Sequence, residues 1–385
     1  MSTPRKTVVS ADNATLRNED GSTHTDLFAA NGTLLLGHSN PEIVRTLAEQ
    51  AQKVWITGRL DTDTRLAAYR LVEQRLPERL RVAGFYSTGM EAGEFALRAA
   101  RVLTGRKNFV GFAKCMHGKS IATASLAWES QFGHDLTGVE RLPFPTADSA
   151  DAVLSRLSEI LREERTAAVF LEAIQGSGGG ASVTGDFSRS LRALCTETQT
   201  LLVADESLAG FHRTGPLFFH DRLELEPDIV LAGKCMGNGF PVSAVLMRRE
   251  YEISPQMLPF STYAENALAM AAVVGTLSEI ARLPVERLAA DIETQIRRHL
   301  GRFSTGHVKL TAVGALCIID VGDARSAQMI ADRSYEEGVL ISQAGPILRL
   351  LPPLTIEPAR LEHGLSIIAG IMSDTFAAGA DARAD

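Results

Sequence analysis

Three apolar runs of strand character end on a charged side chain. Lys234 closes "DIVLAGK" and is followed by glycines, while Glu172 follows "AAVFL" and Asp205 follows "LLVA". Lysine is costly to bury, and glycines let another molecule approach the backbone closely. In an open parallel sheet, ligands bind beyond the carboxyl ends of the strands. These three side chains are therefore the first candidates for chemistry.

A lysine and an acid on neighbouring strand ends allow two interpretations. They can form a buried structural ion pair, which is common in large folds. Alternatively, the lysine amine can attack a carbonyl to form a Schiff base while the carboxylate holds a protonated ring nitrogen. The second interpretation predicts that Lys234 and Asp205 are the catalytic residues of a site for pyridoxal phosphate.

Such a cofactor also needs a binding site for its phosphate, and the segment "FYSTGMEAGEFALRAAR" offers one. Thr88 can cap a helix, and the backbone amides around Gly89 and Met90 would then face an anion at the positive end of the helix dipole. Taken alone, the segment is equally consistent with a plain capped helix.

The glycine-rich segment "GSGGGA" at residues 176–181 imitates a dinucleotide-binding fingerprint. It follows a strand and precedes the strand that ends at Asp205, as that fingerprint requires. However, the fingerprint needs a helix that begins at the glycines themselves, and here "SVTGD" intervenes before "FSRSLRALCTE". We therefore expect a flexible surface loop rather than a nicotinamide site.

The order of elements indicates an α/β fold. Nearly continuous apolar strands separated by amphipathic helices predict a mostly parallel sheet covered by helices on both faces. We expect these strands at 81–87, 108–113, 167–174, 200–207, 228–234 and 243–248. Helices are expected at 264–282 and 284–302, ahead of a smaller mixed α/β lobe. Near the N-terminus, Asp20-Gly21 predicts a hairpin, and Asn40 with Pro41 predicts the start of a helix.

Composition limits the class of protein. The chain has 385 residues, 45% of them hydrophobic and 22% charged, with a formal net charge of -7. The acidic balance argues against nucleic acid and anionic membrane as partners. No signal-like segment, membrane-spanning run or metal-ligand spacing is evident, and the four cysteines are scattered. We expect a cytoplasmic protein with free thiols and no metal.

With these residues placed, the chain resembles the class III aminotransferases, pyridoxal phosphate enzymes of fold type I that include ornithine, acetylornithine and 4-aminobutyrate aminotransferases. The resemblance runs from about residue 15 to about residue 372 in the family's order. It is carried by "STGMEAGEFALRAARVLTGRKNFVGFAKCMHGKS", "AAVFLEAIQGSGGG", "LLVADESLAGFHRTGPLF", "PDIVLAGKCMGNGFPVSAVL", "FSTYAENALAMAA" and "LRLLPPLTI".

The resemblance implies a role for each matching residue. Lys234 would hold the cofactor as a Schiff base and, once released, move the proton between the substrate and the cofactor. Asp205 would pair with the ring nitrogen. Thr88, Gly89 and Met90 would bind the phosphate.

Two further matches concern the partner subunit and the substrate. The threonine of the family's "STY" reaches the phosphate of the other subunit, so Thr262 implies a homodimer with active sites at the interface. Arg349 matches the arginine that binds a substrate carboxylate.

The chain departs from the family's pattern around the cofactor. Met116, before His117, replaces an aromatic residue that stacks on the ring, and Ser207 replaces a Val or Ile beneath it. Leu208 replaces a glutamine that touches the ring hydroxyl. Ser177 stands where ornithine and 4-aminobutyrate aminotransferases have the glutamate that pairs with the carboxylate-binding arginine. Without that acid, we expect Arg349 to favour substrates with a carboxylate near the reacting amine.

Two more positions have a functional and a structural interpretation. The "GGNP" of many relatives reads Ala264-Glu265-Asn266-Ala267 here, so Glu265 is either a specificity residue near the phosphate or a solvated acid at a helix start. Arg59 is either a second carboxylate ligand or, as we expect, a surface arginine.

The function expected from the sequence is a ping-pong transfer of an amino group from an amino acid or amine to a keto acid. The alternatives are other chemistry on the same fold (decarboxylase, racemase or aminomutase) and a non-catalytic cofactor-binding homologue. We expect an N-terminal segment at 1–45 that joins the small lobe, a large cofactor-binding domain at 46–280 and a small C-terminal domain at 281–385.

Overall fold

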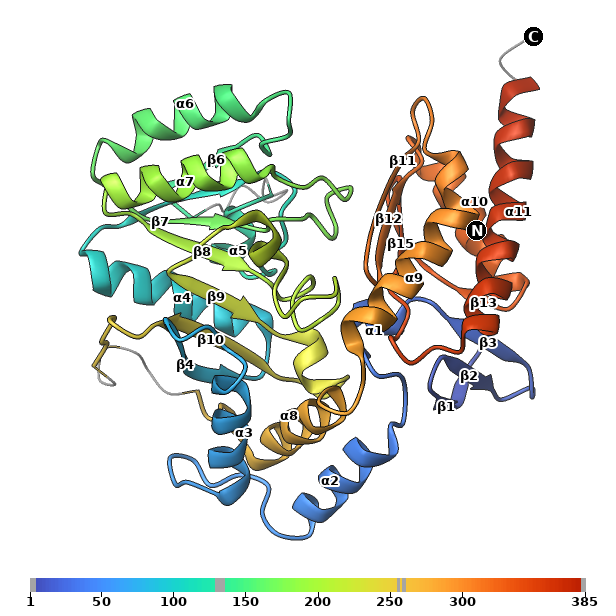
Figure 1. Cartoon of the computed structure of the whole chain (residues 1–385), viewed down its shortest axis with the longest axis horizontal. Helices are drawn as coiled ribbons and strands as arrows, with labels where there is room; N and C mark the ends of the chain where they lie inside the picture. The colour runs from blue at the N-terminus through green and yellow to red at the C-terminus, as the bar shows by residue number, and fades with distance from the viewer. Residues whose placement is uncertain (1–4, 129–135, 255–256, 258–260, 382–385) are drawn as a thin grey trace. The chain divides into compact units, whose positions relative to one another are not determined.

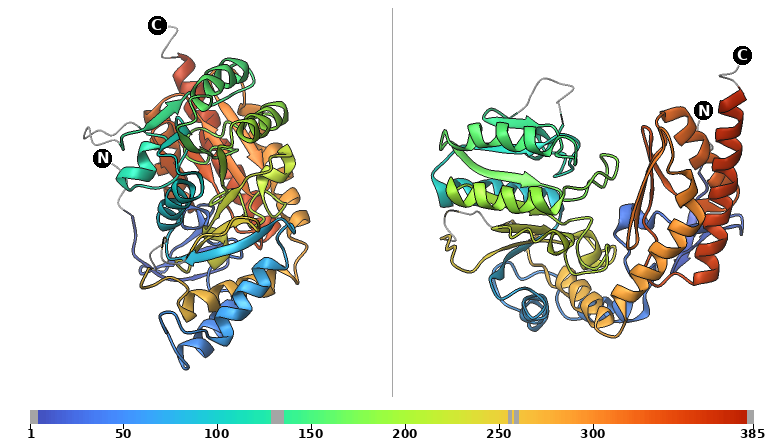
Figure 2. Two further views of the ribbon diagram at one scale, coloured as in Figure 1. Left: turned by 90° about the vertical axis from the view of Figure 1, so that its left-hand side faces the viewer. Right: turned by 45° about the horizontal axis from the view of Figure 1, so that its top comes forward.

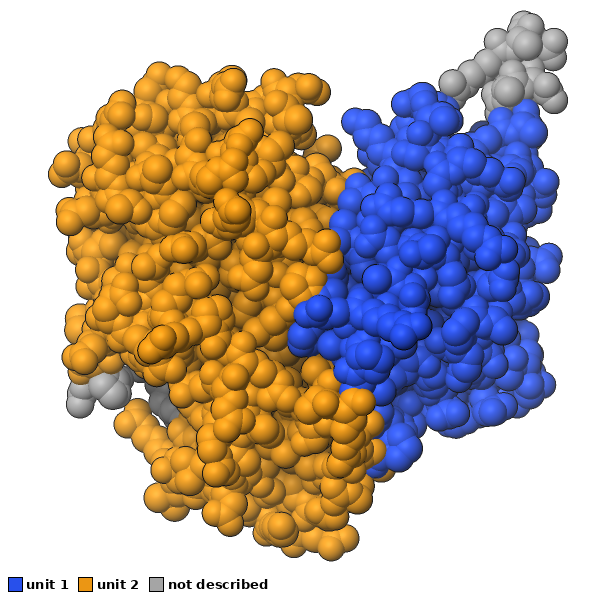
Figure 3. Space-filling model, in the orientation of Figure 1, with its two compact units in different colours: residues 1–41, 212–215, 283–385 blue, residues 42–211, 216–282 orange. Residues whose placement is uncertain are grey.

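The computed structural model describes residues 5–128, 136–254, 257 and 261–381, with only the backbone over 378–381. The chain forms two compact units (Figure 3). The larger comprises residues 42–211 and 216–282, and the smaller comprises residues 1–41, 212–215 and 283–385. The domain boundaries after residues 45 and 280 stay a prediction.

The larger unit is built on a seven-stranded sheet with the strand order β4-β10-β9-β8-β7-β5-β6. β10 runs antiparallel to both of its neighbours, and the other pairings are parallel. The strands are β4 (Leu80–Tyr86), β5 (Asn108–Phe112), β6 (Val139–Leu142), β7 (Thr166–Leu171), β8 (Leu201–Asp205), β9 (Ile229–Ala232) and β10 (Ser243–Arg248).

Helices cover this sheet (Figure 1). Small residues of α4 (Gly89–Thr104), among them Ala92, Ala96 and Ala100, pack with the inward side chains of β5, β7, β8, β9 and β10 to form the core. α7 (Gly185–Glu197) packs on β8 and lies beside α6 (Ala150–Leu161), as Figure 2 also shows. The remaining helices of the unit are α2 (Pro41–Ala51), α3 (Asp63–Glu73), α5 (Ile121–Ser125) and α8 (Ala267–Ile280), with 3-10 turns η1 (Phe219–Leu223) and η2 (Lys234–Gly237).

The smaller unit joins the two ends of the chain. β1 (Val8–Asp12), β2 (Thr15–Asn18) and β3 (Thr23–Asp26) form an antiparallel series, and β3 pairs in parallel with β13 (Val339–Leu340). A second sheet has the order β11-β12-β15-β14. Its strands are β11 (Lys309–Val313), β12 (Leu316–Asp320), β15 (Ile347–Leu350) and β14 (Ser342–Ala344), accompanied by α1 (Ala29–Gly32), α9 (Val285–Leu300), η3 (Gly301–Phe303), α10 (Ala324–Glu336) and α11 (Pro358–Asp381).

The expected α/β architecture is confirmed. All six expected strands are present, and the hairpin at Gly21 and the helix that begins at Pro41 are present as well. β6 was not expected, because "VERL" is short and half of it is charged. Over the residues that the structure covers, no single helix is long and apolar enough to span a membrane, although α8 and the segment Val285–Phe303 pass that test of length and composition as a pair.

Candidate functional site

The catalytic candidates lie at the same edge of the larger sheet. Asp205 ends β8 and pairs in register with Leu231 of β9, and Lys234 follows soon after the end of that strand. The backbone of Lys234 is left-handed, with φ 41°, as the chain leaves the strand and enters η2. The spatial proximity that the ends of neighbouring parallel strands imply is therefore present.

Asp205 is a buried carboxylate with hydrogen-bond donors around it. The ring Nδ1 of His117 lies 2.9 Å from its Oδ2, and the N–H of Ser207 donates to its Oδ1 over 3.0 Å. Burial alone would raise the pKa of Asp205, but the hydrogen bond and charge of His117 and the hydrogen bonds of Ser207 hold that pKa below its usual value. The side chain is therefore kept anionic in a dry environment.

The predicted phosphate segment lies at the same edge. Thr88 caps α4, since its side chain accepts from the N–H of Glu91. The hydroxyl of Ser243, at the start of β10, donates to the carbonyl of Thr88 over 2.7 Å. A methyl group added at Gly89 would lie 3.7 Å from Oγ of Ser207, so this segment lies beside the residues that follow Asp205.

Glu172 joins two loops at this edge. Its Oε2 accepts from the N–H of Met116 over 3.0 Å, and its Oε1 accepts from the N–H of Gly176 over 3.1 Å. Burial and the nearby charge of Asp205 raise the pKa of Glu172 to about 7. The sequence marked Glu172 as a strand end, but its role as a link between the two loops was not predicted.

The glycine-rich loop is packed rather than flexible. Its ends are bridged at Ile174 and Ser182, and α7 begins only at Gly185, so the helix expected of a dinucleotide fingerprint does not begin at the glycines. A methyl group on Gly176 would overlap the buried side chain of Leu208. The expectation of a flexible surface loop is wrong because this close packing fixes the loop that carries Ser177.

Met116 and His117 are neighbours in the sequence but differ in burial. The ring of His117 is buried, and its Nε2 has no hydrogen-bond partner within the described part of the chain. Met116 is half-buried and is held through its backbone by Glu172. The segment therefore presents one polar ring to Asp205 and leaves a thioether partly accessible.

Thr262 is exposed in the turn that precedes α8. In the same turn, Glu265 forms an ion pair with Arg65, and the hydroxyl of Tyr69 donates to it. The side chain of Glu265 is 9% exposed, so the interpretation as a solvated acid is wrong. Arg59 is exposed, as expected.

Arg349 belongs to the smaller unit, on β15. Its Nη2 donates to Oδ1 of Asn31 over 3.0 Å and to Oγ of Ser342 over 2.8 Å. Two neutral oxygens thus orient the guanidinium group.

Two residues of the site were not predicted as functional. Glu91 completes the capping box of α4, and the pattern Thr-x-x-Glu in the sequence could have revealed it. Ser243 carries no comparable local pattern, because its contact with Thr88 depends on the pairing of β10 with β4.

The comparisons with known proteins agree with this arrangement. Residues 2–372 match the family model described as aminotransferase class-III. The chain is 31% identical to a 2-aminoadipate transaminase of Pseudomonas putida, with 94% of each chain covered, and 30% identical to an acetylornithine aminotransferase of Bacillus subtilis, with 91% of each covered. Among solved structures, it superposes on an ornithine aminotransferase of Toxoplasma gondii with a TM-score of 0.83 and 26% identity, covering 96% of this chain and 91% of that one.

The protein belongs to the class III aminotransferases. It is an enzyme that transfers amino groups and uses pyridoxal phosphate.

The residues present fit that cofactor. A buried carboxylate kept anionic suits a protonated ring nitrogen, which would supply the missing counter-charge. The start of α4 offers backbone N–H groups to a phosphate. Lys234 supplies the amine just after the neighbouring strand, at the start of η2.

Proposed function

We propose that the protein transfers the amino group of an α-amino acid to a keto acid by a ping-pong mechanism, with Lys234 and Asp205 as its catalytic residues. The observation that carries the proposal is the buried, anionic Asp205, held by His117 at the end of β8 beside the strand that leads to Lys234. A structural ion pair alone would not require a second feature at the same sheet edge, the capped start of α4 at Thr88 and Gly89, which is suited to bind an anion.

The two catalytic residues have different tasks. Bound pyridoxal phosphate supplies an aldehyde and a ring that accepts electrons. Lys234 would hold the cofactor through its Nζ and would carry the proton that the substrate loses at Cα. Asp205 would face the ring nitrogen, and His117 and Ser207 orient Asp205.

The substrate carboxylate is bound by Arg349. Asn31 and Ser342 accept hydrogen bonds from Nη2 of Arg349 and orient its guanidinium group. Ser177 provides no acid to compete for the guanidinium group. This supports a substrate with a carboxylate next to the reacting amine in both half-reactions. The relatives named for 2-aminoadipate and acetylornithine both act on amino acids or their derivatives.

The functional form is a homodimer in which Thr262 contacts the cofactor phosphate of the partner subunit. Several large apolar side chains are exposed near the phosphate segment: Trp55, Leu60, Met90, Ile121 and Tyr263. Trp55 lies beside the start of α8, because the N–H of Ala267 donates to its carbonyl, and the turn that carries Tyr263 lies beside the start of α4, because Ser261 donates to Glu91. Exposed apolar groups that gather on one face are typical of protein interfaces.

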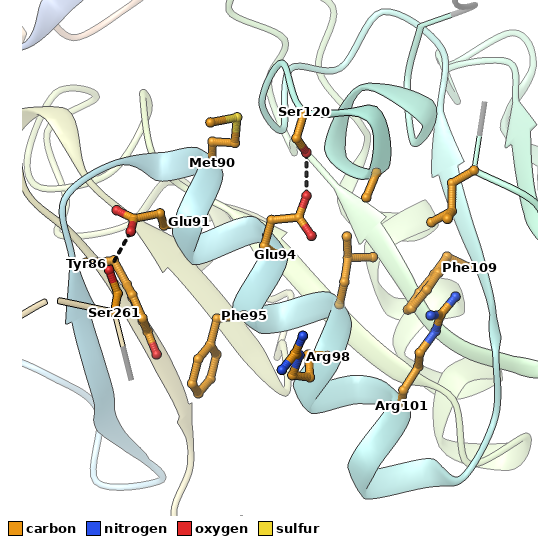
Figure 4. Close-up of a pocket in the computed structure, with 13 residues that line it drawn as sticks. Tyr86, Met90, Glu91, Glu94, Phe95, Arg98, Arg101, Phe109, Ser120 and Ser261 are labelled. Atoms are coloured by element: carbon orange, nitrogen blue, oxygen red, sulfur yellow. Dashed lines mark hydrogen bonds between the residues drawn. The ribbon is translucent and has the colours of Figure 1, made fainter. Parts of the chain in front are cut away.

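A shallow apolar cavity extends this face along α4. It measures about 530 Å³, and its lining combines Tyr86, Phe95, Phe109 and Leu136 with charged residues such as Glu94 and Arg98 (Figure 4). A second copy of the chain would bury it. The cytoplasm is the proposed location, since all four cysteines are free and buried.

Absorption spectroscopy of the purified protein, loaded with pyridoxal phosphate, tests this function. We expect α-amino acids to convert the visible cofactor band to that of pyridoxamine phosphate with release of the keto acid, and a keto acid to reverse the change. Borohydride reduction followed by mass spectrometry should place the cofactor on Lys234, and Lys234→Ala should lose the adduct.

The same experiment separates the alternatives. Release of carbon dioxide or racemised substrate without pyridoxamine phosphate would identify another reaction on this fold. A stable adduct that no amino acid or amine alters would identify a non-catalytic binding protein. Equal rates with a diamine that lacks a carboxylate would overturn the role of Arg349.

A further inference from the structure

We infer that the turn at residues 261–266 is a preformed phosphate-binding arm, and that Glu265 and Ser261 are the positioning residues that set Thr262 against the cofactor phosphate of a second copy of this chain. The inference rests on the proposed dimer and phosphate site. It adds residues that act through Thr262 and do not themselves touch the cofactor.

Glu265 fastens the C-terminal end of the turn. Its backbone is left-handed, with φ 58°, a conformation that is strained for a residue other than glycine. Its carboxylate is held by two residues one helical turn apart on α3, the guanidinium of Arg65 and the hydroxyl of Tyr69. These contacts offset the strain, so the charged side chain holds a backbone shape that glycine would adopt without help.

The support behind Glu265 is itself rigid. Arg65 and Glu265 have side chains only 15% and 9% exposed. The ring of Tyr69 meets the ring of Phe85 edge to face, with centroids 5.0 Å apart. Phe85 lies on β4, the strand that leads into the phosphate segment. The turn and that segment are thus connected through a single packed cluster.

Ser261 fastens the N-terminal end of the turn. Its hydroxyl donates to Oε1 of Glu91 over 2.8 Å (Figure 4). The other oxygen of Glu91 accepts from the N–H groups of Ser87 and Thr88 over 2.9 and 3.2 Å. One carboxylate therefore connects the turn to the residues at the start of α4.

Between these two ends, hydrogen bonds hold the turn, and Thr262 is exposed. The N–H of Ala264 donates to the carbonyl of Ser261, and Ala264 is buried. Asn266 caps α8 with its Oδ1 and donates from Nδ2 to the carbonyl of Tyr263. Thr262 is exposed in the same turn. A hydroxyl displayed on a rigid, exposed turn is suited to a ligand outside its own subunit.

The side chains of the phosphate segment, Thr88 to Met90, offer few hydrogen-bond donors to an anion. Gly89 has no side chain, and the thioether of Met90 cannot donate a hydrogen bond. Thr88 uses its side-chain oxygen to cap α4, and its N–H donates to Glu91. A donor from elsewhere is therefore valuable for an anion that forms several hydrogen bonds.

Titration of the apoprotein with pyridoxal phosphate and with pyridoxal, which lacks the phosphate, tests the inference. We expect Glu265→Gln, Ser261→Ala and Thr262→Ala each to weaken pyridoxal phosphate binding about tenfold, as for the loss of one positioned hydrogen bond to a charged group. Pyridoxal binding should change less than twofold, because the aldehyde contact with Lys234 is intact. The control is Glu279→Gln, which removes an ion pair with Arg282 at the far end of α8 and should bind both ligands as the wild type does.

Mixed dimers show whether the arm acts on the partner. In a dimer of Glu265→Gln and Lys234→Ala chains, the subunit that keeps Lys234 receives an intact turn from its neighbour. We expect that one site per dimer to regain wild-type affinity for pyridoxal phosphate. Affinity that stays low in the mixed dimer would overturn the inference.

The remaining outcomes are equally decisive. Unchanged phosphate binding in Ser261→Ala and Thr262→Ala overturns the inference while the proposed function stands, provided that the wild type binds the cofactor and transaminates. If Glu265→Gln does not fold, Ser261→Ala and Tyr69→Phe carry the same test, since they keep the buried charge pair. A wild-type protein that binds no pyridoxal phosphate overturns the proposed function and, with it, this inference.

Discussion

Asp205 and Glu172 are buried at the same sheet edge, and their surroundings shift their pKa values in opposite directions. Asp205 receives hydrogen bonds from His117 and Ser207, which lower its pKa despite burial. Glu172 accepts hydrogen bonds from the N–H groups of Met116 and Gly176 and lies near the charge of Asp205, and burial and that charge raise its pKa to about 7. Their effects on stability therefore fall in different pH ranges.

Replacing Ser207 by Ala should move the acid sensitivity of the apoprotein to higher pH. A carboxyl whose pKa is lowered by folding stabilises the fold above its unfolded pKa, and this stability is lost as the pH falls through the folded pKa. Removing the hydroxyl of Ser207 raises the pKa of Asp205, because one of the groups that lower it is lost. Urea unfolding at several pH values between 3 and 6 measures this shift. Ser366→Ala, on the surface of α11, is the control and should show the pH dependence of the wild type.

Replacing Glu172 by Gln should flatten the pH dependence of stability at higher pH. A carboxyl with a raised pKa stabilises the fold below its unfolded pKa of 4.5, and the contribution is lost as the pH rises through about 7. The wild type should lose about 3 kcal/mol of unfolding free energy from this group between pH 4.5 and 8, and Glu172→Gln should not.

The slope, rather than the absolute stability, decides this prediction. Gln presents an amide group to a backbone N–H and so adds a cost that does not vary with pH. Asp205→Asn provides the second check. It removes the charge next to Glu172. The loss of unfolding free energy that comes from Glu172 should then occur at lower pH than in the wild type. Identical slopes for the wild type and Glu172→Gln would contradict the assignment.

Single residues differ in how far the sequence could reveal them. Lys234 and Asp205 end apolar runs, so the strand pattern alone placed them at one sheet edge. The partner of Glu265 could not be found this way, because Arg65 lies on α3, far away in the sequence, and only the packing of α3 on α8 brings them together. Local patterns reveal caps and strand ends, whereas pairs between distant elements depend on tertiary packing.

At the level of elements, α1 is an unusual left-handed turn. Ala29, Ala30, Asn31 and Gly32 have φ values of 46°, 48°, 63° and 77°. For the non-glycine residues this conformation costs about 1 kcal/mol each, and such strain is typical of functional segments. The turn brings Oδ1 of Asn31 to Nη2 of Arg349. Ala29 and Ala30 gave no indication of it, because alanine favours the right-handed helix, whereas Asn31 and Gly32 tolerate the left-handed conformation.

Substitution of Asn31 should change substrate choice more than turnover. Asn31→Asp places a carboxylate on the guanidinium of Arg349, where it competes with the carboxylate of the substrate. We expect the KM for α-amino acids to rise about tenfold with kcat little changed, as for one displaced charge-assisted contact, while a diamine without a carboxylate is unaffected.

Asn31→Gly is the matched variant for this prediction. Glycine adopts the left-handed backbone freely, so only the hydrogen bond to Arg349 is lost. A rise in KM of a few-fold is expected, smaller than that for Asn31→Asp. If the two variants gave the same KM, competition by the added charge would be ruled out.

For the whole molecule, the pairing between N-terminal and C-terminal strands is the feature that local sequence patterns predict least well. The parallel pairing of β3 with β13 joins residues near the N-terminus to strands more than three hundred residues later. By contrast, the order of strands and helices in the larger unit follows from alternating apolar runs and amphipathic stretches. The oligomeric state also depends on the folded surface, because the exposed apolar residues around Met90 come from separate parts of the chain.

Replacing Ile121 by Asp should separate the proposed dimer. Ile121 is the first residue of α5 and is 65% exposed, so the subunit gains nothing from its apolar side chain. An acid in the first turn suits the helix dipole, and Ser120 still caps the helix, so the monomer should fold. A buried, unpaired charge in an interface costs several kcal/mol, enough to shift the mass in sedimentation equilibrium from twice the chain mass toward 41.5 kDa.

The separated monomer should also lose cofactor phosphate contacts, because Thr262 is proposed to act across the interface. We therefore expect the affinity for pyridoxal phosphate to fall with dimer dissociation and to recover, at least in part, when protein concentration is raised, as mass action requires. Met329→Asp is the control, since Met329 is an exposed apolar residue on α10 in the smaller unit. A chain that remains dimeric with Ile121→Asp, or a monomer that keeps full affinity, would place the interface or the phosphate contact elsewhere.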